Sequence, residues 1–175
     1  MRLQKIPLAK VFIPLVLLVL LGFLLAWRLQ VGLTRFFDVD EFTHLHWAAN
    51  VARGQRPYID FFTFFTPGFY WALAPLFWLL PGDPQLFIVA RVIMFAVFVG
   101  MVGLLAVLFG KLRSWKYALL PGVILAFLPM PYDKFLDIRP DNEATLLAVI
   151  GVKAEIWSIS TCAKASADKG DAGRW

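Results

Sequence analysis

The sequence predicts an all-α membrane protein with three to four transmembrane helices and two interfacial helices in the first outer loop. Hydrophobic residues make up 60% of the 175 positions, and the mean hydropathy is +0.71. These residues gather in long runs, which is typical of a multi-pass membrane protein and not of a soluble domain. The net charge of +5 comes from basic residues that separate the runs, so it indicates topology and not nucleic-acid binding.

The first apolar run predicts a span at about residues 6–27. Val11 to Trp27 is uninterrupted apolar sequence, and with the residues before it can cross a hydrocarbon core of about 30 Å. Because the run is long and no small-residue cleavage site precedes Arg28, an uncleaved anchor is favoured over a signal peptide. The basic residues ahead of the run predict a cytoplasmic N-terminus, which places the loop at 28–85 outside.

The outer loop begins with a predicted surface helix at about residues 40–53. Asp38 is a suitable N-cap, and Glu41 follows three residues later, as in a capping box. Apolar residues then recur at helical spacing and form one stripe. Gly54 is a natural C-terminal stop for this helix.

A second surface helix is predicted at about residues 67–80. Thr66-Pro67 suggests an N-cap followed by proline at the first helical position. The helix is short for a span, and a crossing here would place the basic cluster after residue 110 on the outside. The aromatic residues from Phe61 to Trp71 are interpreted as a membrane-interface belt, with a groove for a polyprenyl chain as the alternative.

Further spans are predicted at about residues 86–110 and 117–131, and a fourth begins at 143–152. Arg91 lies about a turn and a half inside the first of these. Its side chain either snorkels outward or pairs with an acid of the outer loops, and snorkelling is favoured because it costs less. The 117–131 span is short and is interrupted by Pro121-Gly122.

The fourth apolar helix stops after about nine residues at Lys153, and nine residues cannot cross a bilayer. Residues 1–152 therefore form the predicted transmembrane part, and 153–175 form a polar tail. The tail either bends this helix along the surface or marks an interrupted gene, and interruption is favoured.

Asp40 and Glu41 form an acidic pair at the start of the first surface helix. A carboxylate near apolar surface can act as the general base that takes a proton from an acceptor hydroxyl. The alternative is that these acids and Asp38 only cap the helix and complement its dipole. Asp38 and Glu41 suit capping better, which makes Asp40 the preferred catalytic candidate.

Two histidines follow these acids. His44 is four residues from Asp40 and shares its helix face, so it is a candidate to modulate Asp40 or to contact substrate. His44 and His46 are two apart and lie on different faces, and Cys162 is the only cysteine. No metal site and no cofactor are therefore predicted, although a divalent metal is left open.

A second polar cluster, around Arg139 and Asp141, is predicted to face the same side as Asp40. The Arg139 guanidinium could hold a phosphate bidentately. The alternative, which the pattern alone favours, is a local ion pair of Arg139 with Asp137 or Asp141. In that case Asp141 or Asn142 would be the N-cap of the next helix.

The order of these motifs resembles the first outer loop of GT-C membrane glycosyltransferases, in the family related to protein O-mannosyltransferases and lipid A aminoarabinose transferases. The motifs are Asp40-Glu41, His44-Leu45-His46, Gly54, Pro57-Tyr58, Asp60-Phe61-Phe62 and Thr66-Pro67. The stretch from Ile138 to Asn142 resembles the segment that opens the fourth span in bacterial members. The resemblance covers residues 1 to about 150 and does not cover the tail.

The resemblance implies an enzyme of the cell (inner) membrane that moves a sugar from a polyprenyl-phosphate donor to an acceptor hydroxyl at the outer face. Asp40 matches the proposed catalytic base of that family, and Glu41 would help to hold the acceptor or a neighbouring loop. Arg139 and Asp141 would belong to the site near the donor phosphate. The sugar, the acceptor and the oligomeric state are left open.

Family members continue through further spans and usually a C-terminal outer domain. We therefore expect this chain to be a truncated N-terminal portion that is catalytically inactive by itself. Two alternatives from other classes stand beside it. One is a small, non-catalytic membrane-anchoring or assembly subunit, and the other is a transporter fragment with Arg91 and the acids on an ion path.

Overall fold

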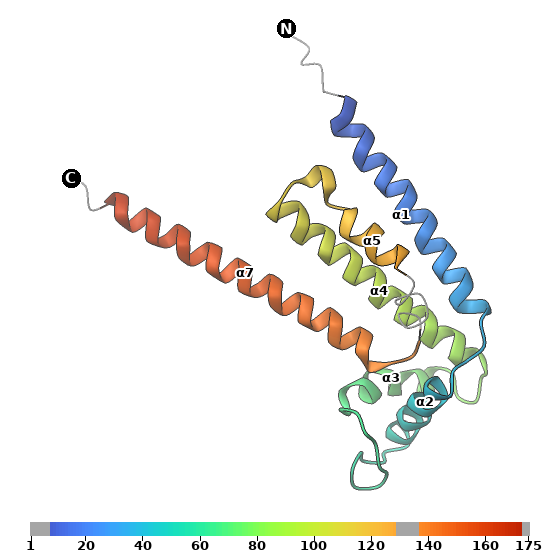
Figure 1. Cartoon of the computed structure of the whole chain (residues 1–175). Helices are drawn as coiled ribbons and strands as arrows, with labels where there is room; N and C mark the ends of the chain where they lie inside the picture. The colour runs from blue at the N-terminus through green and yellow to red at the C-terminus, as the bar shows by residue number, and fades with distance from the viewer. Residues whose placement is uncertain (1–7, 129–136, 173–175) are drawn as a thin grey trace.

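The computed structural model describes residues 8–128 and 137–172, and every regular element in that part is helical (Figure 1). The elements are α1 (Leu8–Thr34), α2 (Val39–Ala52), α3 (Gly68–Leu79), α4 (Gln85–Leu112), the 3-10 turn η1 (Trp115–Tyr117), α5 (Leu120–Phe127) and α7 (Pro140–Ala172). An isolated β-bridge joins Pro57 and Phe61 in the loop between α2 and α3. The predicted all-α class is confirmed for the described residues.

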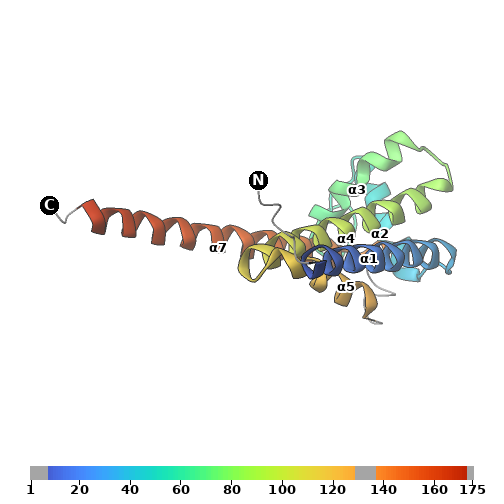
Figure 2. The same cartoon turned by 90° about the horizontal axis from the view of Figure 1, so that it is seen from above.

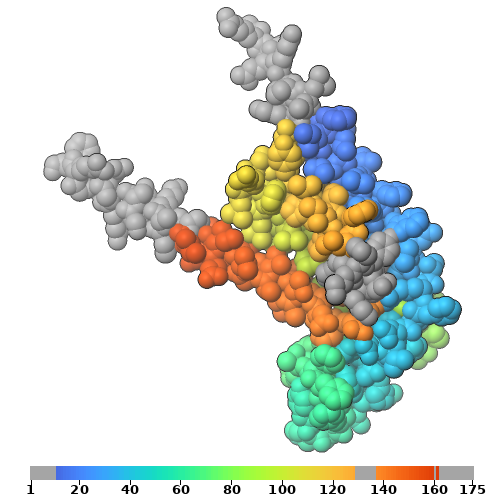
Figure 3. Space-filling model, in the orientation of Figure 1, coloured from blue at the N-terminus to red at the C-terminus, as the bar shows by residue number. Residues whose placement is uncertain are grey.

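The helices form a bundle with a smaller lobe at one end. Helices α1, α4 and α5 pack together, α7 runs along α4 and then extends beyond it, and α2 packs on α3 (Figures 1 and 2). The space-filling view shows the α2–α3 lobe at the lower end of the bundle (Figure 3). Two segments, Val11–Thr34 and Gln85–Leu112, are long and apolar enough to cross a membrane.

Helix α1 is longer than the predicted span at 6–27, because it continues through Arg28 to Thr34. The Arg28 side chain is only 1% exposed, although it lies in apolar surroundings. Its Nε donates to the carbonyl of Ala126 at 2.8 Å, and its Nη2 donates to that of Leu128 at 2.9 Å. A charge with such partners need not end the helix, since its donors are satisfied inside the bundle.

Helix α2 agrees with its prediction in both caps. The Asp38 side chain accepts from the first turn, and the Asp38 N–H donates to Glu41 Oε2 at 3.0 Å, which completes the capping box. The helix ends at Ala52, and Gly54 follows with a φ of +86°, a conformation that glycine adopts without steric cost.

Helix α3 confirms the predicted short helix but not its predicted cap. The N-cap is Pro67 and not Thr66, because the Pro67 carbonyl accepts from the N–H groups of both Tyr70 and Trp71 at 3.1 Å. The apolar faces of α2 and α3 form one core with the first half of α4. That core is made of Leu45, Trp47, Ala48, Phe69, Tyr70, Leu73, Leu76, Leu86, Ala90, Met94 and Ile138.

Helix α4 is a long apolar helix at the position of the predicted span at 86–110, whereas shorter pieces largely replace the helix predicted at 117–131. Helix α5 has 8 residues, or about 12 Å, and the backbone becomes extended at Leu128. Pro121 lies in the first turn of α5, where proline is compatible with a helix, so it begins this helix and does not break it. Residues 129–131 lie outside the described part.

Helix α7 continues through Lys153 to Ala172, so the prediction that it stops at Lys153 is wrong. Residues 154–172 include five alanines, and alanine has the highest helix propensity of all residues. The predicted polar tail is therefore helical as far as residue 172. Residues 173–175 lie outside the described part.

Candidate functional site

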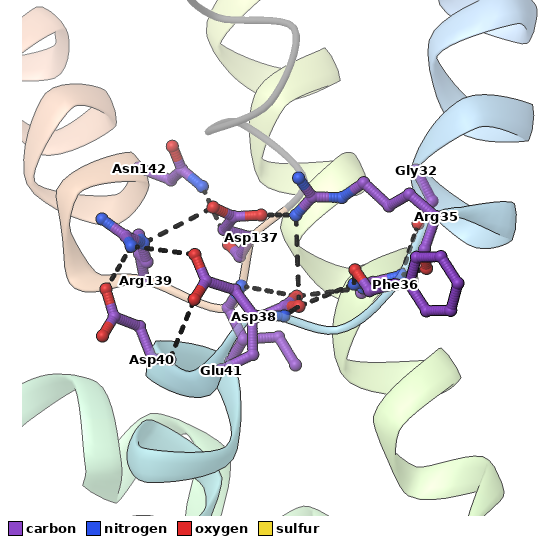
Figure 4. A network of polar contacts seen from close by, with 11 residues as sticks. Gly32, Arg35, Phe36, Asp38, Asp40, Glu41, Asp137, Arg139 and Asn142 are labelled. Carbon is purple, nitrogen blue, oxygen red and sulfur yellow. Dashed lines mark hydrogen bonds and ion pairs between the residues drawn. The ribbon is translucent and has the colours of Figure 1, made fainter.

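A network of charged side chains joins three parts of the fold at the lobe end of the bundle (Figure 4). One group comes from the α1–α2 connection and the start of α2, one residue comes from α4, and one group precedes α7. The members are Arg35, Asp38, Asp40, Glu41, Arg91, Asp137 and Arg139. The two polar segments that the sequence predicts on one side are thus in direct contact.

Glu41 and Arg91 form the buried centre of this network. Arg91 Nε donates to Glu41 Oε1 at 2.9 Å, and Arg91 Nη2 donates to Glu41 Oε2 at 2.6 Å, so the pair is bidentate. Both side chains are 0% exposed. Two charges removed from water in this way need close geometry and further hydrogen bonds to offset their lost hydration.

The prediction that Arg91 snorkels outward is wrong, and the alternative, pairing with an acid of the outer loop, is the one observed. The remaining donors of Arg91 meet the carbonyl oxygens at the end of α1, those of Gly32, Arg35 and Phe36, at 2.7–3.1 Å. The guanidinium carbon also lies 3.8 Å from the centre of the Phe37 ring. With all five donors used, the side chain gains nothing by turning toward water.

The Glu41 carboxylate also holds the segment before α7. Its Oε1 accepts from the Ile138 N–H at 3.3 Å, and its Oε2 accepts from the Asp38 N–H at 3.0 Å. Each oxygen therefore has an arginine partner and a backbone partner. The capping role predicted for Glu41 is confirmed, and the same side chain binds a neighbouring loop.

Arg139 links the two sides of the network near its surface. Its Nη2 pairs with Asp40 and lies 3.4 Å from Asp38 Oδ2, and its Nε lies 3.5 Å from Asp137 Oδ2. The predicted local pair with Asp137 is present, but Arg139 also reaches across to the acids of α2. One guanidinium thus holds carboxylates from positions about 100 residues apart.

Asp40 lies at the solvent-exposed edge of the network. Its side chain is 53% exposed, whereas those of Glu41 and Asp137 are 0% exposed. Asp38 caps α2 and is 39% exposed, and Glu41 is enclosed, so Asp40 is the most exposed acid of the network. An exposed carboxylate next to a buried ion network is an arrangement suited to chemistry on a bound hydroxyl.

Asp141 and Asn142 lie in the first turn of α7, which begins at Pro140, so neither precedes the helix as an N-cap. Asn142 Nδ2 donates to the Asp137 carbonyl at 3.2 Å and stabilises the entry to the helix. Asp141 is exposed and lies outside the ion pairs among the described residues. Of the two predicted residues in this segment, only Arg139 joins the network.

His44 follows Asp40 by four residues in α2 and is surrounded by aromatic rings. Its ring centre is 5.1 Å from that of Phe65 and 5.6 Å from that of Phe69, and the side chain is buried. Burial lowers the pKa of His44 from its ordinary value of 6.5; Arg139 adds to this effect, while Asp40 and Asp141 oppose it. The imidazole is therefore neutral at pH 7. Its Nδ1 has no hydrogen-bond partner among the described residues.

His46 does not join His44. It is exposed and its Nε2 lies 3.3 Å from Asn50 Nδ2, on another face of α2. Within residues 8–128 and 137–172, no three His, Cys, Asp or Glu residues are placed to hold a metal ion together.

Sequence reasoning missed Arg35, and it expected Asp137 to pair only with Arg139, whereas Arg35 and Asp137 also pair with each other. Arg35 follows the last turn of α1, and Asp137 precedes α7 by three residues. A charge at each end of an apolar run is a weak signal, because it is equally typical of a solvated helix end. Their pairing depends on the packing of α1 against the segment before α7.

Comparison of the chain with protein-family models, with curated proteins and with solved structures finds no match. The site offers an exposed carboxylate, a guanidinium paired with it, and a buried ion pair that holds the segments from which both project.

Proposed function

We propose that this chain supplies the acceptor-activating part of a membrane glycosyltransferase of the GT-C type, which moves a sugar from a polyprenyl-phosphate donor to an acceptor hydroxyl. The observation that carries this proposal is the exposure of Asp40 beside Arg139, at the edge of a network whose centre is buried. The motif resemblance in the first outer loop selects the reaction class. The chemistry fits a base for the acceptor and a cation for the donor phosphate.

In this proposal α1 and α4 cross the inner membrane, the N-terminus is cytoplasmic, and the network faces outward. Support comes from the path of the chain. Arg91 lies in the network, and the end of α4 at Leu112 is about 32 Å further along the helix. Asp137, further along the chain, also lies in the network. The chain therefore leaves the network along α4 and comes back to it, and the length of α4 beyond Arg91 is close to a bilayer core of about 30 Å.

The reaction brings together Asp40, the acceptor hydroxyl and the donor sugar. Asp40 accepts the proton of the acceptor hydroxyl while the hydroxyl oxygen bonds to the anomeric carbon of the donor sugar. The bond from that carbon to the phosphate oxygen breaks, and polyprenyl phosphate leaves with the bonding electrons. Attack opposite the leaving group inverts the configuration at the anomeric carbon.

Arg139 connects binding of the donor phosphate to the ability of Asp40 to accept a proton. In the structure its guanidinium is paired with Asp40. An arriving phosphate competes for that guanidinium, since phosphate and carboxylate match the same fork of donors. Transfer of Arg139 from Asp40 to the phosphate frees the carboxylate to accept a proton only when a donor is present.

Donor binding provides the test. The full chain in nanodiscs is titrated with a polyprenyl-phosphate sugar, and binding is followed calorimetrically. We expect Arg139→Gln to weaken binding roughly tenfold or more, since a charged hydrogen bond is lost. Asp40→Asn should bind at least as tightly as the natural chain, because it removes a competitor for Arg139. Arg56→Gln, in an exposed pair with Asp60 outside the network, is the control.

Equal binding by the natural chain and Arg139→Gln would contradict the proposed donor site. Weaker binding by Asp40→Asn would contradict the competition between carboxylate and phosphate. Sidedness is tested with single cysteines at positions 40 and 140, introduced in a Cys162→Ser background. Both should react with an impermeant maleimide added from outside intact spheroplasts, and labelling from opposite faces would refute the shared site.

A non-catalytic assembly subunit is the second candidate, favoured by the completeness of the buried pairs. Arg91 donates all its hydrogen bonds to Glu41 and to the end of α1, as expected of a residue whose role is to stabilise the fold. In that case Arg139→Gln lowers stability, and the natural chain shows no saturable binding of polyprenyl-phosphate sugar. The titration above therefore separates the two candidates.

A further inference from the structure

A groove lies between α4 and α7, far from the ion network. It has a volume of about 630 Å³, and most of its lining is apolar, including Leu108, Leu112, Ile150 and Trp157. Two lysines, Lys111 from α4 and Lys153 from α7, complete the lining. It forms where α7 separates from α4 as both helices run away from the α2–α3 lobe (Figures 1 and 2).

The groove lies about one hydrocarbon thickness from the network. Lys111 is about 30 Å along α4 from Arg91, and Trp157 is about 25 Å along α7 from Pro140, at about 1.5 Å per residue. A bilayer core is about 30 Å thick. If the network lies at one membrane surface, the two lysines and Trp157 therefore lie at the other.

We propose that this groove binds an anionic phospholipid of the inner leaflet, with its phosphate between Lys111 and Lys153 and an acyl chain along Leu108 and Ile150. The inference rests on the membrane placement of the proposed function but not on its chemistry. The site is formed by chain segments that play no part in the ion network.

Charge and shape both favour a lipid over a protein segment. No acidic residue is found among the described residues that line the groove, so two cations share an apolar space with no partner for their charge inside it. An anionic headgroup supplies that charge, and basic pockets between helices on this side of a membrane suit such headgroups. Trp157 is 73% exposed, and tryptophan is favoured at the level of the headgroups.

Contact quenching of Trp157 tests the proposal. The full chain is placed in phosphatidylcholine nanodiscs that contain a minor fraction of brominated phosphatidylglycerol or, separately, brominated phosphatidylcholine. The chain has 7 tryptophans, so the Trp157 signal is taken as the difference between the natural chain and Trp157→Phe. Quenching by brominated phosphatidylglycerol should reach its midpoint at a roughly tenfold lower lipid fraction than quenching by brominated phosphatidylcholine.

Matched variants assign this preference to the groove. Lys111→Gln with Lys153→Gln should abolish it, and Lys111→Arg with Lys153→Arg should keep it. Arg113→Gln with Lys116→Gln removes the same charge from the same end of the molecule but outside the groove, so it should also keep the preference. Circular dichroism and size exclusion establish that each variant folds.

Three results would overturn the proposal. Equal quenching by the two lipids would show that the lysines do not select the headgroup. Loss of the preference in the Arg113–Lys116 variant would indicate general surface attraction. Quenching by neither lipid would show that the groove is covered by protein or lies outside the bilayer, and this result would leave donor binding at Arg139 unaffected.

Discussion

Nη2 of Arg91 lies 2.6 Å from Oε2 of Glu41, and both side chains are enclosed by protein. This pair connects residues that are 50 positions apart and fixes the start of α2 against α4. Through the Ile138 N–H, the same carboxylate also holds the segment that leads into α7. Asp40 and Arg139 lie nearer the surface than this buried pair.

Removal of one partner from the pair should be strongly destabilising. We expect Glu41→Gln and Arg91→Gln each to lower the free energy of unfolding by about 3–5 kcal/mol, because each leaves an uncompensated buried charge. The measurement is denaturant unfolding of the chain in mixed micelles, followed by circular dichroism.

The double variant Glu41→Gln with Arg91→Gln gives the decisive comparison. It removes both charges of the pair and leaves neither one uncompensated, so its loss of stability should be clearly smaller than the sum of the two single losses. Additive losses would mean that the two side chains do not interact as described.

His44 predicts a pH dependence of stability. Burial, with Arg139, lowers the pKa of His44 below 6.5, while Asp40 and Asp141 partly oppose this. The unfolded chain therefore binds a proton at this residue at a higher pH than the folded chain does. Its contribution to stability is complete above about pH 6.5 and is lost as the pH falls toward the folded pKa.

A phenylalanine at this position keeps the ring packing and removes the titration. His44→Phe should therefore show a flatter stability profile between pH 7 and pH 5 than the natural chain. His46→Phe, which changes an exposed histidine on another face of α2, is the matched control. A slope that is unchanged by His44→Phe would exclude this residue as its source.

Gly122 is expected to be essential for the packing of α5 on α4. A Cβ at this position would lie 2.6 Å from Cγ1 of Val102. Valine has one strongly preferred rotamer in a helix and cannot turn aside. Gly122→Ala should cost about 1–3 kcal/mol through overpacking, in spite of its better helix propensity.

Two further variants test this explanation with thermal unfolding. Addition of Val102→Ala to Gly122→Ala should recover much of the loss by making room for the methyl group. Gly103→Ala, which meets nothing within 4 Å, should be neutral or stabilising by up to about 1 kcal/mol. Destabilisation of equal size by both glycine changes would point to a general effect of alanine and not to contact with Val102.

Arg28 is expected to hold the C-terminal end of α5. Its guanidinium donates to the carbonyls of Ala126 and Leu128 and lies 5.1 Å from the Phe98 ring centre. Arg28→Lys keeps the charge but loses the planar fork, so the last turn of α5 should open more often. Faster amide hydrogen exchange at residues 120–127 is the expected result, and exposed Arg56→Lys should leave that exchange unchanged.

Local signals in the sequence determined most of the helices. The apolar runs predicted α1 and α4, and Asp38, Glu41 and Gly54 predicted both ends of α2. These signals depend on hydrophobicity and on side chains within about four residues, which are present before any tertiary contact forms. The acids beside α2 and the second polar cluster were also identifiable in this way.

Only the tertiary structure decided which charges are paired and which stay accessible. Arg91 is buried because Glu41 and the end of α1 lie next to it, and Arg139 joins Asp40 and not Asp141. The need for glycine at position 122 likewise follows only from its closeness to Val102 of α4. Such partners are separated by tens of residues, and their energy depends on geometry and exclusion of water. Both quantities exist only once the helices have packed.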